Sequence, residues 1–262
     1  MRRGKAALAD KTPQNGAPLL EAKNLSLSYA GKYAFRDLSF AVREREIVAL
    51  LGKSGCGKTS ALCVAGALIP PSEGETLFEG ETLRAPTPKV SMVFQEPNLL
   101  PWLTVERNVS FALELKSLRV AKKERKERVA AALDEAGLAY AAKRFPNELS
   151  GGMAQRAALA RMLVRQAKLT LLDEPFSALD AVTRQTMQRL LRTLMRRHSA
   201  SALIVTHDID EALLIADRVL LMRSSGELSE WNVNAALGEE DERERRSAGF
   251  LDLREEIAAR LD

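Results

Sequence analysis

The sequence predicts an α/β fold with a mostly parallel core sheet, an N-terminal antiparallel β-subdomain and an inserted α-helical subdomain. Apolar strand runs around Leu169, Leu203 and Val219 are separated by helical stretches, an order typical of a parallel sheet. Apolar residues alternate between Leu25 and Val42, which indicates antiparallel strands ahead of the parallel ones. A chain of 262 residues is long enough to bury one core with a subdomain inserted in it.

The pattern of apolar and charged residues divides the chain into three parts. Residues 1–18 include basic residues but lack the apolar centre of a secretory signal, so we do not expect one there. We expect these residues to form a flexible tail. Residues 19–235 form the main domain, with the helical subdomain inserted at about residues 97–165. Residues 236–262 are expected to form a charged helical tail. The longest apolar run, Ala61–Ile69, is too short to span a bilayer.

The first parallel strand leads into a glycine-rich loop. The apolar run Ile47–Leu51 is followed by Gly52–Thr59, with the spacing Gly-x-x-x-x-Gly-Lys-Thr, and then by a helical pattern. Glycines let backbone amides approach an anion closely, and a helix N-terminus favours negative charge. A turn without a ligand is the alternative, and the Lys-Thr pair at the correct offset argues against it. Lys58 is predicted to reach the β- and γ-phosphates of a nucleotide, and the Thr59 hydroxyl to bind Mg²⁺. The residues predicted to bind the nucleotide here are Gly52, Ser54, Gly55, Cys56, Gly57, Lys58, Thr59 and Ser60.

Two further strands end in polar residues suited to hydrolysis at the γ-phosphate of a nucleotide. Leu169–Leu172 leads into Asp173, which is predicted to hold Mg²⁺ through water, and Glu174, which is predicted to polarise an attacking water as general base. A third strand leads into His207, whose imidazole can donate to a γ-phosphate oxygen and orient water. The alternatives are a solvated acidic turn and a structural histidine. The other histidine, His198, is predicted to be a solvated polar residue.

With these motifs in place, the chain resembles the ATPase subunit of an ABC transporter from about residue 19 to residue 222. The resemblance implies an ABC-type P-loop NTPase fold that hydrolyses ATP with Mg²⁺. It also implies that Glu174, His207, Gln95 and Lys58 are catalytic and that Thr59, Gln95 and Asp173 bind the metal. The motifs occur in the order of the family: Gly52–Thr59 as the Walker A loop, Gln95 as the Q-loop glutamine, Leu149–Met153 as the signature, Leu169–Glu174 as Walker B, Ser177–Asp180 as the D-loop and His207 as the switch histidine.

The signature is a serine–glycine turn that opens a helix. Ser150 can cap the helix Gly151–Arg165, which leaves the first amides of that helix free at its electropositive end. An ordinary helix N-cap is the alternative. The resemblance implies that Ser150, Gly151 and Gly152 bind ATP held by an opposing subunit, so that a head-to-tail homodimer encloses two ATP molecules.

Three further positions are interpreted from the resemblance. Tyr29 lies where the family places an aromatic residue that stacks on adenine, and Asp180 of the D-loop is expected at the nucleotide site. The signature most often ends in Gln, whereas here it ends in Met153, whose side chain cannot supply an amide. We expect function to persist, because the backbone glycines carry the anion contact.

The segment after Gln95 is similar to that of one branch of the family. It is apolar and proline-rich, with the run Leu100-Pro101-Trp102, and resembles importers of nitrate, sulfonates and taurine. Residues 250–257 are similar to the C-terminal segment of proteins in the same branch. Residues 238–246, which precede them, are unusually charged and match that branch poorly. In the family this face receives a helix of the membrane permease. Trp102 is interpreted as part of that docking surface or as a core residue of the helical subdomain, and the two interpretations are compatible.

The resemblance predicts an ATPase that energises import through a separate permease. We expect a homodimer, integral membrane permease subunits, an indirect link to a solute-binding protein, and a cytoplasmic location on the inner face of the membrane. The alternatives are export or lipid handling, and a soluble ATPase associated with nucleic acid. We expect no nucleic-acid partner, because the excess of basic residues is small, with 39 Lys and Arg against 35 Asp and Glu. The basic run 116–128 is also interleaved with glutamate. Two cysteines indicate no disulfide framework.

Overall fold

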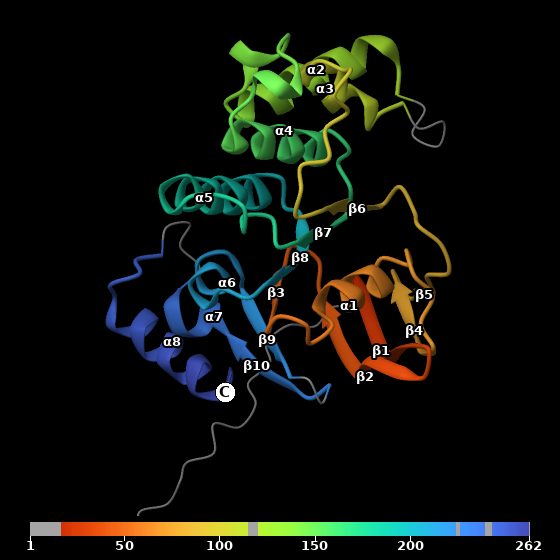
Figure 1. Cartoon of the computed structure of the whole chain (residues 1–262), viewed down its shortest axis with the longest axis vertical. Helices are drawn as coiled ribbons and strands as arrows, with labels where there is room; N and C mark the ends of the chain where they lie inside the picture. The colour runs from red at the N-terminus through yellow and green to blue at the C-terminus, as the bar shows by residue number, and fades with distance from the viewer. Residues whose placement is uncertain (1–16, 115–119, 224–225, 239–242, 262) are drawn as a thin grey trace, which may run out of the picture.

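A six-stranded sheet forms the centre of the computed structural model, which describes residues 17–114, 120–223, 226–238 and 243–261 (Figure 1). Its strand order is β10-β9-β3-β8-β7-β6, and every neighbouring pair is parallel except β9 with β10. The predicted mostly parallel core sheet is confirmed. The short strand β6 and the polar edge strand β10 were not predicted. The strands are β3 (Ile47–Leu51), β6 (Val90–Val93), β7 (Leu169–Asp173), β8 (Ser201–Thr206), β9 (Arg218–Met222) and β10 (Leu228–Asn232).

Both faces of this sheet are covered, which is why its central strands are continuous apolar runs. On one face, Val48 and Leu50 of β3 pack with helix α1 (Lys58–Ala65) and the second sheet. On the other face, Ile47 and Ala49 pack with α5 (Ala181–Arg197), α6 (Ile209–Ile215) and α8 (Ala248–Leu261). Figure 1 shows the core strands between these two layers.

The second sheet is the predicted antiparallel β-subdomain. It has the order β2-β1-β4-β5, and all its pairs are antiparallel. Ala30 and Gly31 form a two-residue turn with φ values of 48° and 79°, the left-handed geometry that suits a tight hairpin. The strands are β1 (Leu20–Tyr29), β2 (Lys32–Val42), β4 (Glu73–Phe78) and β5 (Glu81–Thr82).

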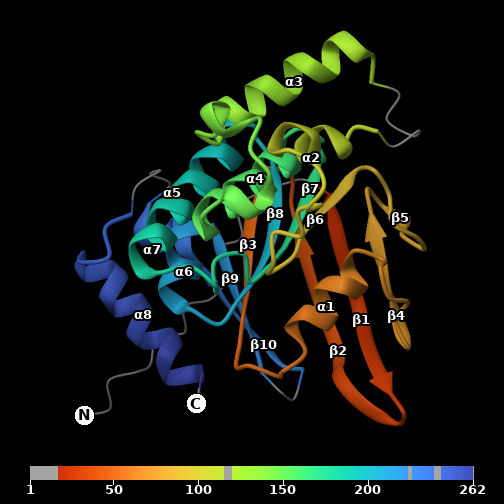
Figure 2. The ribbon, with the colours of Figure 1, turned by 45° about the horizontal axis from the view of Figure 1, so that its top comes forward.

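The helical subdomain forms a third layer with its own apolar cluster (Figure 2). Buried Asn108 holds the segment that enters it, because its side chain accepts from the Leu100 amide and donates to the carbonyls of Leu100, Leu103 and Thr104. Its helices are α2 (Val105–Phe111), α3 (Lys122–Glu135) and α4 (Gly151–Leu163), with short 3₁₀ turns at Ala139–Ala141 and Pro146–Glu148.

The C-terminal part of the chain packs against the core. After the short helix α7 (Val233–Leu237), helix α8 buries Phe250, Leu253 and Ile257 in the same cluster as α5 and α6. The segment expected as a charged helical tail is therefore helical but carries core residues. The expected N-terminal tail lies outside the described residues except for positions 17 and 18, and the run 116–128 and the segment 238–246 are described only in part.

Candidate functional site

The carboxyl ends of the parallel strands bring the predicted site residues together. Leu51 of β3 is in register with Thr206 of β8, and Val205 of β8 is in register with Asp173 of β7. Loops that follow neighbouring parallel strands meet at one edge of the sheet. The glycine-rich loop, Glu174 and His207 therefore start from adjacent positions, and Gln95, which follows β6 next to β7, starts from the same edge.

The loop Gly52–Thr59 has a backbone that requires glycine at two positions. Gly57 has a φ of 99°, and a Cβ added there would lie 2.5 Å from the carbonyl oxygen of Ala34. A Cβ at Gly52 would lie 2.6 Å from the carbonyl oxygen of Met222. Helix α1 has no side-chain cap and no acidic residue in its first turn, so no carboxylate of its own first turn competes for its N-terminal amides. These features fit an anion cradle.

Lys58 lies inside this loop. Its side chain is buried, and Nζ donates to the carbonyl oxygens of Gly52 at 2.8 Å and Lys53 at 2.9 Å. The ammonium group is thus held within the predicted cradle. Of the other predicted loop residues, Ser54 and Gly55 are exposed, Cys56 is buried and Ser60 is half-buried. Their contact with nucleotide stays a prediction.

Thr59 and Asp173 form a pair suited to Mg²⁺. Thr59 Oγ1 donates to Asp173 Oδ1 at 2.9 Å, although the two residues are 114 positions apart. Burial raises the pKa of the Asp173 carboxyl, and the Thr59 hydrogen bond opposes this. Among the described residues no group of three or more His, Cys, Asp or Glu could hold a metal. One hydroxyl and one carboxylate fit Mg²⁺, which keeps several waters and takes the remaining oxygens from phosphate.

Glu174 and His207 lie within hydrogen-bonding distance of each other. His207 Nδ1 is 3.1 Å from Glu174 Oε2. The backbone of Glu174 is fixed, because its amide donates to Val205 of β8 and its carbonyl accepts from the Ser177 hydroxyl. Its φ of 42° is uncommon for a residue with a side chain. The structure therefore joins the predicted general base and the predicted switch histidine.

Gln95 is exposed just beyond β6, and the segment after it is tied to helix α4. The Arg161 guanidinium of α4 donates to the carbonyl oxygens of Pro97 at 2.6 Å and Asn98 at 2.7 Å. Burial lowers the pKa of Arg161. This contact could not be predicted from the sequence, because Arg161 lies in an ordinary helical pattern. Arg161 links the Gln95 segment to the helix that the signature opens.

The signature turn caps α4 as predicted. Ser150 Oγ accepts from the Met153 amide at 3.3 Å. A Cβ at Gly152 would lie 2.7 Å from Thr183 Cγ2, so only glycine fits there without movement. A Cβ at Gly151 would meet nothing nearer than 3.9 Å. Figures 1 and 2 show α4 in the helical layer, apart from α1 and the loop before it.

Asp180 and Tyr29 lie on separate elements. Asp180 caps α5, because Oδ1 accepts from the amides of Val182 and Thr183 at 3.1 and 3.0 Å, and hydrogen bonds with Thr183 are the main cause that lowers its pKa. Tyr29 is exposed at the end of β1, in the hairpin whose other strand contacts Gly57 through Ala34. Stacking of Tyr29 on adenine stays a prediction.

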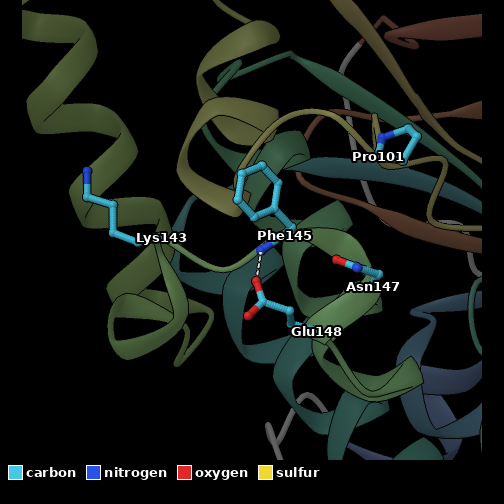
Figure 3. Close-up of a pocket in the computed structure, with 5 residues that line it drawn as sticks. All are labelled: Pro101, Lys143, Phe145, Asn147 and Glu148. Atoms are coloured by element: carbon cyan, nitrogen blue, oxygen red, sulfur yellow. Dashed lines mark hydrogen bonds between the residues drawn. The ribbon is translucent and has the colours of Figure 1, made fainter.

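A surface hollow of about 690 Å³ lies on the helical subdomain (Figure 3). Phe145 is fixed at its edge, because its amide donates to Glu148 Oε2 at 2.6 Å. Nearby in the chain, Trp102 is 70% exposed. The interpretation of Trp102 as a core residue is therefore wrong. The hollow is lined by Pro101, Lys143, Phe145, Asn147 and Glu148, and we call it the subdomain hollow.

None of the helices in the described part of the chain combines the length and apolar character needed to cross a bilayer.

His198 is exposed, as predicted, and its Nε2 lies 2.6 Å from Glu135 Oε2.

Comparisons with known proteins give one consistent result. The family model described as "ABC transporter" matches residues 35–177. The aliphatic sulfonates import ATP-binding protein SsuB 2 of Burkholderia cenocepacia is 44% identical over 205 residues, covering 78% of this chain and 74% of the relative. The nitrate import ATP-binding protein NrtC of Synechococcus elongatus is 42% identical over 193 residues, covering 73% of this chain and 29% of the relative. A solved dimer of the ATP-binding cassette MJ0796, in a post-hydrolysis state bound to ADP and phosphate, is 30% identical with a TM-score of 0.72, covering 82% of this chain and 98% of that one.

Proposed function

Because the chain belongs to the ABC transporter family and is an ATPase of that family, we propose that it energises an importer of a small anionic or zwitterionic solute. One observation carries the catalytic part of this proposal. Thr59 with Asp173, and Glu174 with His207, form two hydrogen-bonded pairs at the edge of the sheet where the glycine-rich loop begins. The solute class rests on the relatives, whose names specify aliphatic sulfonates and nitrate.

In this proposal the side chains of the site divide the steps of ATP hydrolysis among them. The loop amides and Lys58 bind the phosphates of ATP, with Thr59 and Asp173 holding Mg²⁺, which neutralises charge that develops on the phosphates. Glu174 polarises the attacking water as general base. His207, hydrogen-bonded to Glu174, orients that carboxylate and donates toward the γ-phosphate. Gln95 reaches the metal or the water from the neighbouring strand end.

We propose that each ATP site is completed by a second copy of the chain. Ser150, Gly151 and Gly152 offer backbone amides at the N-terminus of α4. Helix α4 lies in the helical layer, apart from α1 and the loop before it (Figures 1 and 2). A head-to-tail homodimer brings this helix end to the γ-phosphate held by the partner. Asp180 caps α5, the helix whose Thr183 lies against Gly152 of the signature, and in this proposal it belongs to the same interface.

The proposed membrane partner binds at the subdomain hollow. Exposed Trp102 and Phe145 offer apolar contact area, and Lys143 and Glu148 offer a polar rim, a composition that suits a protein interface. Arg161 joins the segment after Gln95 to α4, so a permease helix seated here contacts a segment that leads directly to the ATP site. The chain is then held at the inner face of the membrane through the permease, which receives solute from a binding protein.

An uptake assay in a strain that lacks this chain tests the proposed function. We expect loss of uptake of labelled nitrate, taurine or ethanesulfonate, restored by the wild-type chain and not by Glu174→Gln. If the strain that lacks this chain takes up all three solutes at the parental rate and loses solute extrusion, the proposed function would be export and not import.

A further inference from the structure

The C-terminal segment holds helix α6 from both ends. At the end of α6, buried Arg243 donates through Nη1 to the carbonyl oxygens of Leu213 and Ala216, both at 2.6 Å. At the start of α6, Asp210 lies 2.7 Å from Arg254 Nε and 3.8 Å from Arg245 Nη1. Residues 243–254 therefore contact both termini of a helix of only seven residues.

A chain of polar side chains, from half-buried Arg245 to buried Gln188 and Glu211, joins the same segment to the middle of α6. Arg245 Nη2 donates to Gln188 Oε1 at 3.1 Å, and Gln188 Nε2 donates to Glu211 Oε2 at 3.1 Å. Gln188 and Glu211 are 1% and 3% exposed, so neither can exchange its partner for water. An amide offers its oxygen on one side and its nitrogen on the other, so Arg245 fixes which side of Gln188 faces Glu211.

Helix α6 begins directly after the predicted switch histidine. Asp208 caps the helix, because its Oδ1 accepts from the Glu211 amide at 3.1 Å, and His207 is the preceding residue. Glu174, the partner of His207, is not part of α6, and its backbone N–H donates a hydrogen bond to the carbonyl oxygen of Val205 in β8. A shift of α6 would therefore move His207 relative to Glu174.

We propose that Arg245 is a positioning residue that, through Gln188 and Glu211, holds α6 so that His207 stays in contact with Glu174. This inference rests on the proposed role of His207 in hydrolysis. It assigns a task in the ATP site to a segment that touches none of the predicted nucleotide ligands in the described structure.

The full-length chain with Arg245→Met tests the proposal. We expect kcat for ATP hydrolysis to fall about threefold to tenfold, the size of effect typical of coupling through a packed polar network. KM for ATP should stay within about twofold, because no phosphate-binding group changes. Arg245→Lys, which keeps a donor for Gln188, should recover most of kcat. Arg246→Met, an exposed arginine in the same segment, is the matched control and should leave kcat unchanged.

Two further measurements separate positioning from general loss of structure. Without nucleotide, amide hydrogen exchange in residues 208–216 should be faster in Arg245→Met than in Arg246→Met, whereas exchange in β7 and β8 stays unchanged. In a Gln188→Met background, Arg245→Met should cause no additional fall in kcat, because the chain to Glu211 is already broken.

Three results for Arg245→Met would overturn the proposal. They are an unchanged kcat, a rise in KM as large as the fall in kcat, and unchanged amide exchange in residues 208–216. The variant His207→Ala tests the underlying function independently. If His207→Ala hydrolyses ATP at the wild-type rate, the role of His207 fails. If it is inactive while Arg245→Met is fully active, only the positioning role of Arg245 fails.

Discussion

At the residue scale, the site depends on side chains that are far apart in the sequence and adjacent in space. Glu174 has a left-handed backbone, a fixed amide and a fixed carbonyl, so its carboxylate has little freedom to move away from His207. Such preorganisation suits a general base, because the group need not be reordered when water is activated.

Replacing Glu174 by glutamine tests the general base. We expect Glu174→Gln to lower kcat by about 10²- to 10⁴-fold, because the amide cannot accept the proton of the attacking water. ATP binding should persist, so the variant should accumulate as an ATP-bound dimer in size-exclusion chromatography. Phosphate release at the wild-type rate would show that another group is the base.

Buried Glu211 should make stability depend on pH. Burial, the largest cause, raises its pKa from 4.5 to about 7. Between these values the folded state keeps a proton that the unfolded state loses, so this contribution to the free energy of unfolding falls as pH rises from 4.5 to about 7. Because a shift of one pKa unit corresponds to ~1.36 kcal/mol, the free energy of unfolding should fall by about 3 kcal/mol over this range.

Urea unfolding of the wild type and of Glu211→Gln from pH 4.5 to pH 8 checks this. The variant lacks the titrating group, so we expect a flatter dependence across that range, and exposed Glu255→Gln is the control for loss of one charge. Parallel curves for the wild type and Glu211→Gln would contradict the prediction.

At the scale of elements, the C-terminal helix is part of the main core. Phe250 of α8 is 1% exposed and shares a cluster with α5 and α6, whereas its neighbour Leu251 is 45% exposed. The two residues therefore form a matched pair on one helix, one facing the core and one facing solvent.

We expect Phe250→Ala to lower the free energy of unfolding by about 3–5 kcal/mol, because it removes a buried ring and leaves a cavity. Leu251→Ala should change it by no more than about 0.5 kcal/mol, as surface substitutions do. Urea denaturation measures both effects, provided that the slope of the unfolding free energy against urea concentration is the same as in the wild type. Equal small effects would mean that α8 is only loosely attached in solution.

At the scale of the whole molecule, the chain carries the two parts of the proposed phosphate site on different layers. The glycine-rich loop belongs to the sheet, and the capped N-terminus of α4 belongs to the helical layer (Figures 1 and 2). One chain does not bring these parts together, which is the physical basis for the proposed homodimer.

Mixing two inactive variants tests this arrangement. Lys58→Ala removes the phosphate-binding ammonium, and Ser150→Arg blocks the signature end. Each variant alone should be inactive, whereas an equal mixture should regain about one quarter of wild-type turnover, because half the dimers are mixed and each carries one intact site. An inactive mixture that forms heterodimers would contradict a shared site.

The sequence by itself determined the local chemistry. The Gly-Lys-Thr loop, the acidic pair after an apolar strand and the capped serine–glycine turn are encoded by neighbouring residues, because glycine geometry, strand burial and helix capping act over a few positions. Periodicity also indicated both sheets. It did not reveal β6, which has only four residues, or the polar edge strand β10.

Only the tertiary structure decided how distant parts meet. Strand order placed Thr59 beside Asp173, packing left Trp102 exposed, and α8 joined the core through Phe250. Apolar periodicity states which side chains are to be buried but not which element will cover them. The contacts of Arg245 with Gln188 and of Arg161 with Pro97 likewise follow from packing between elements that are remote in the chain.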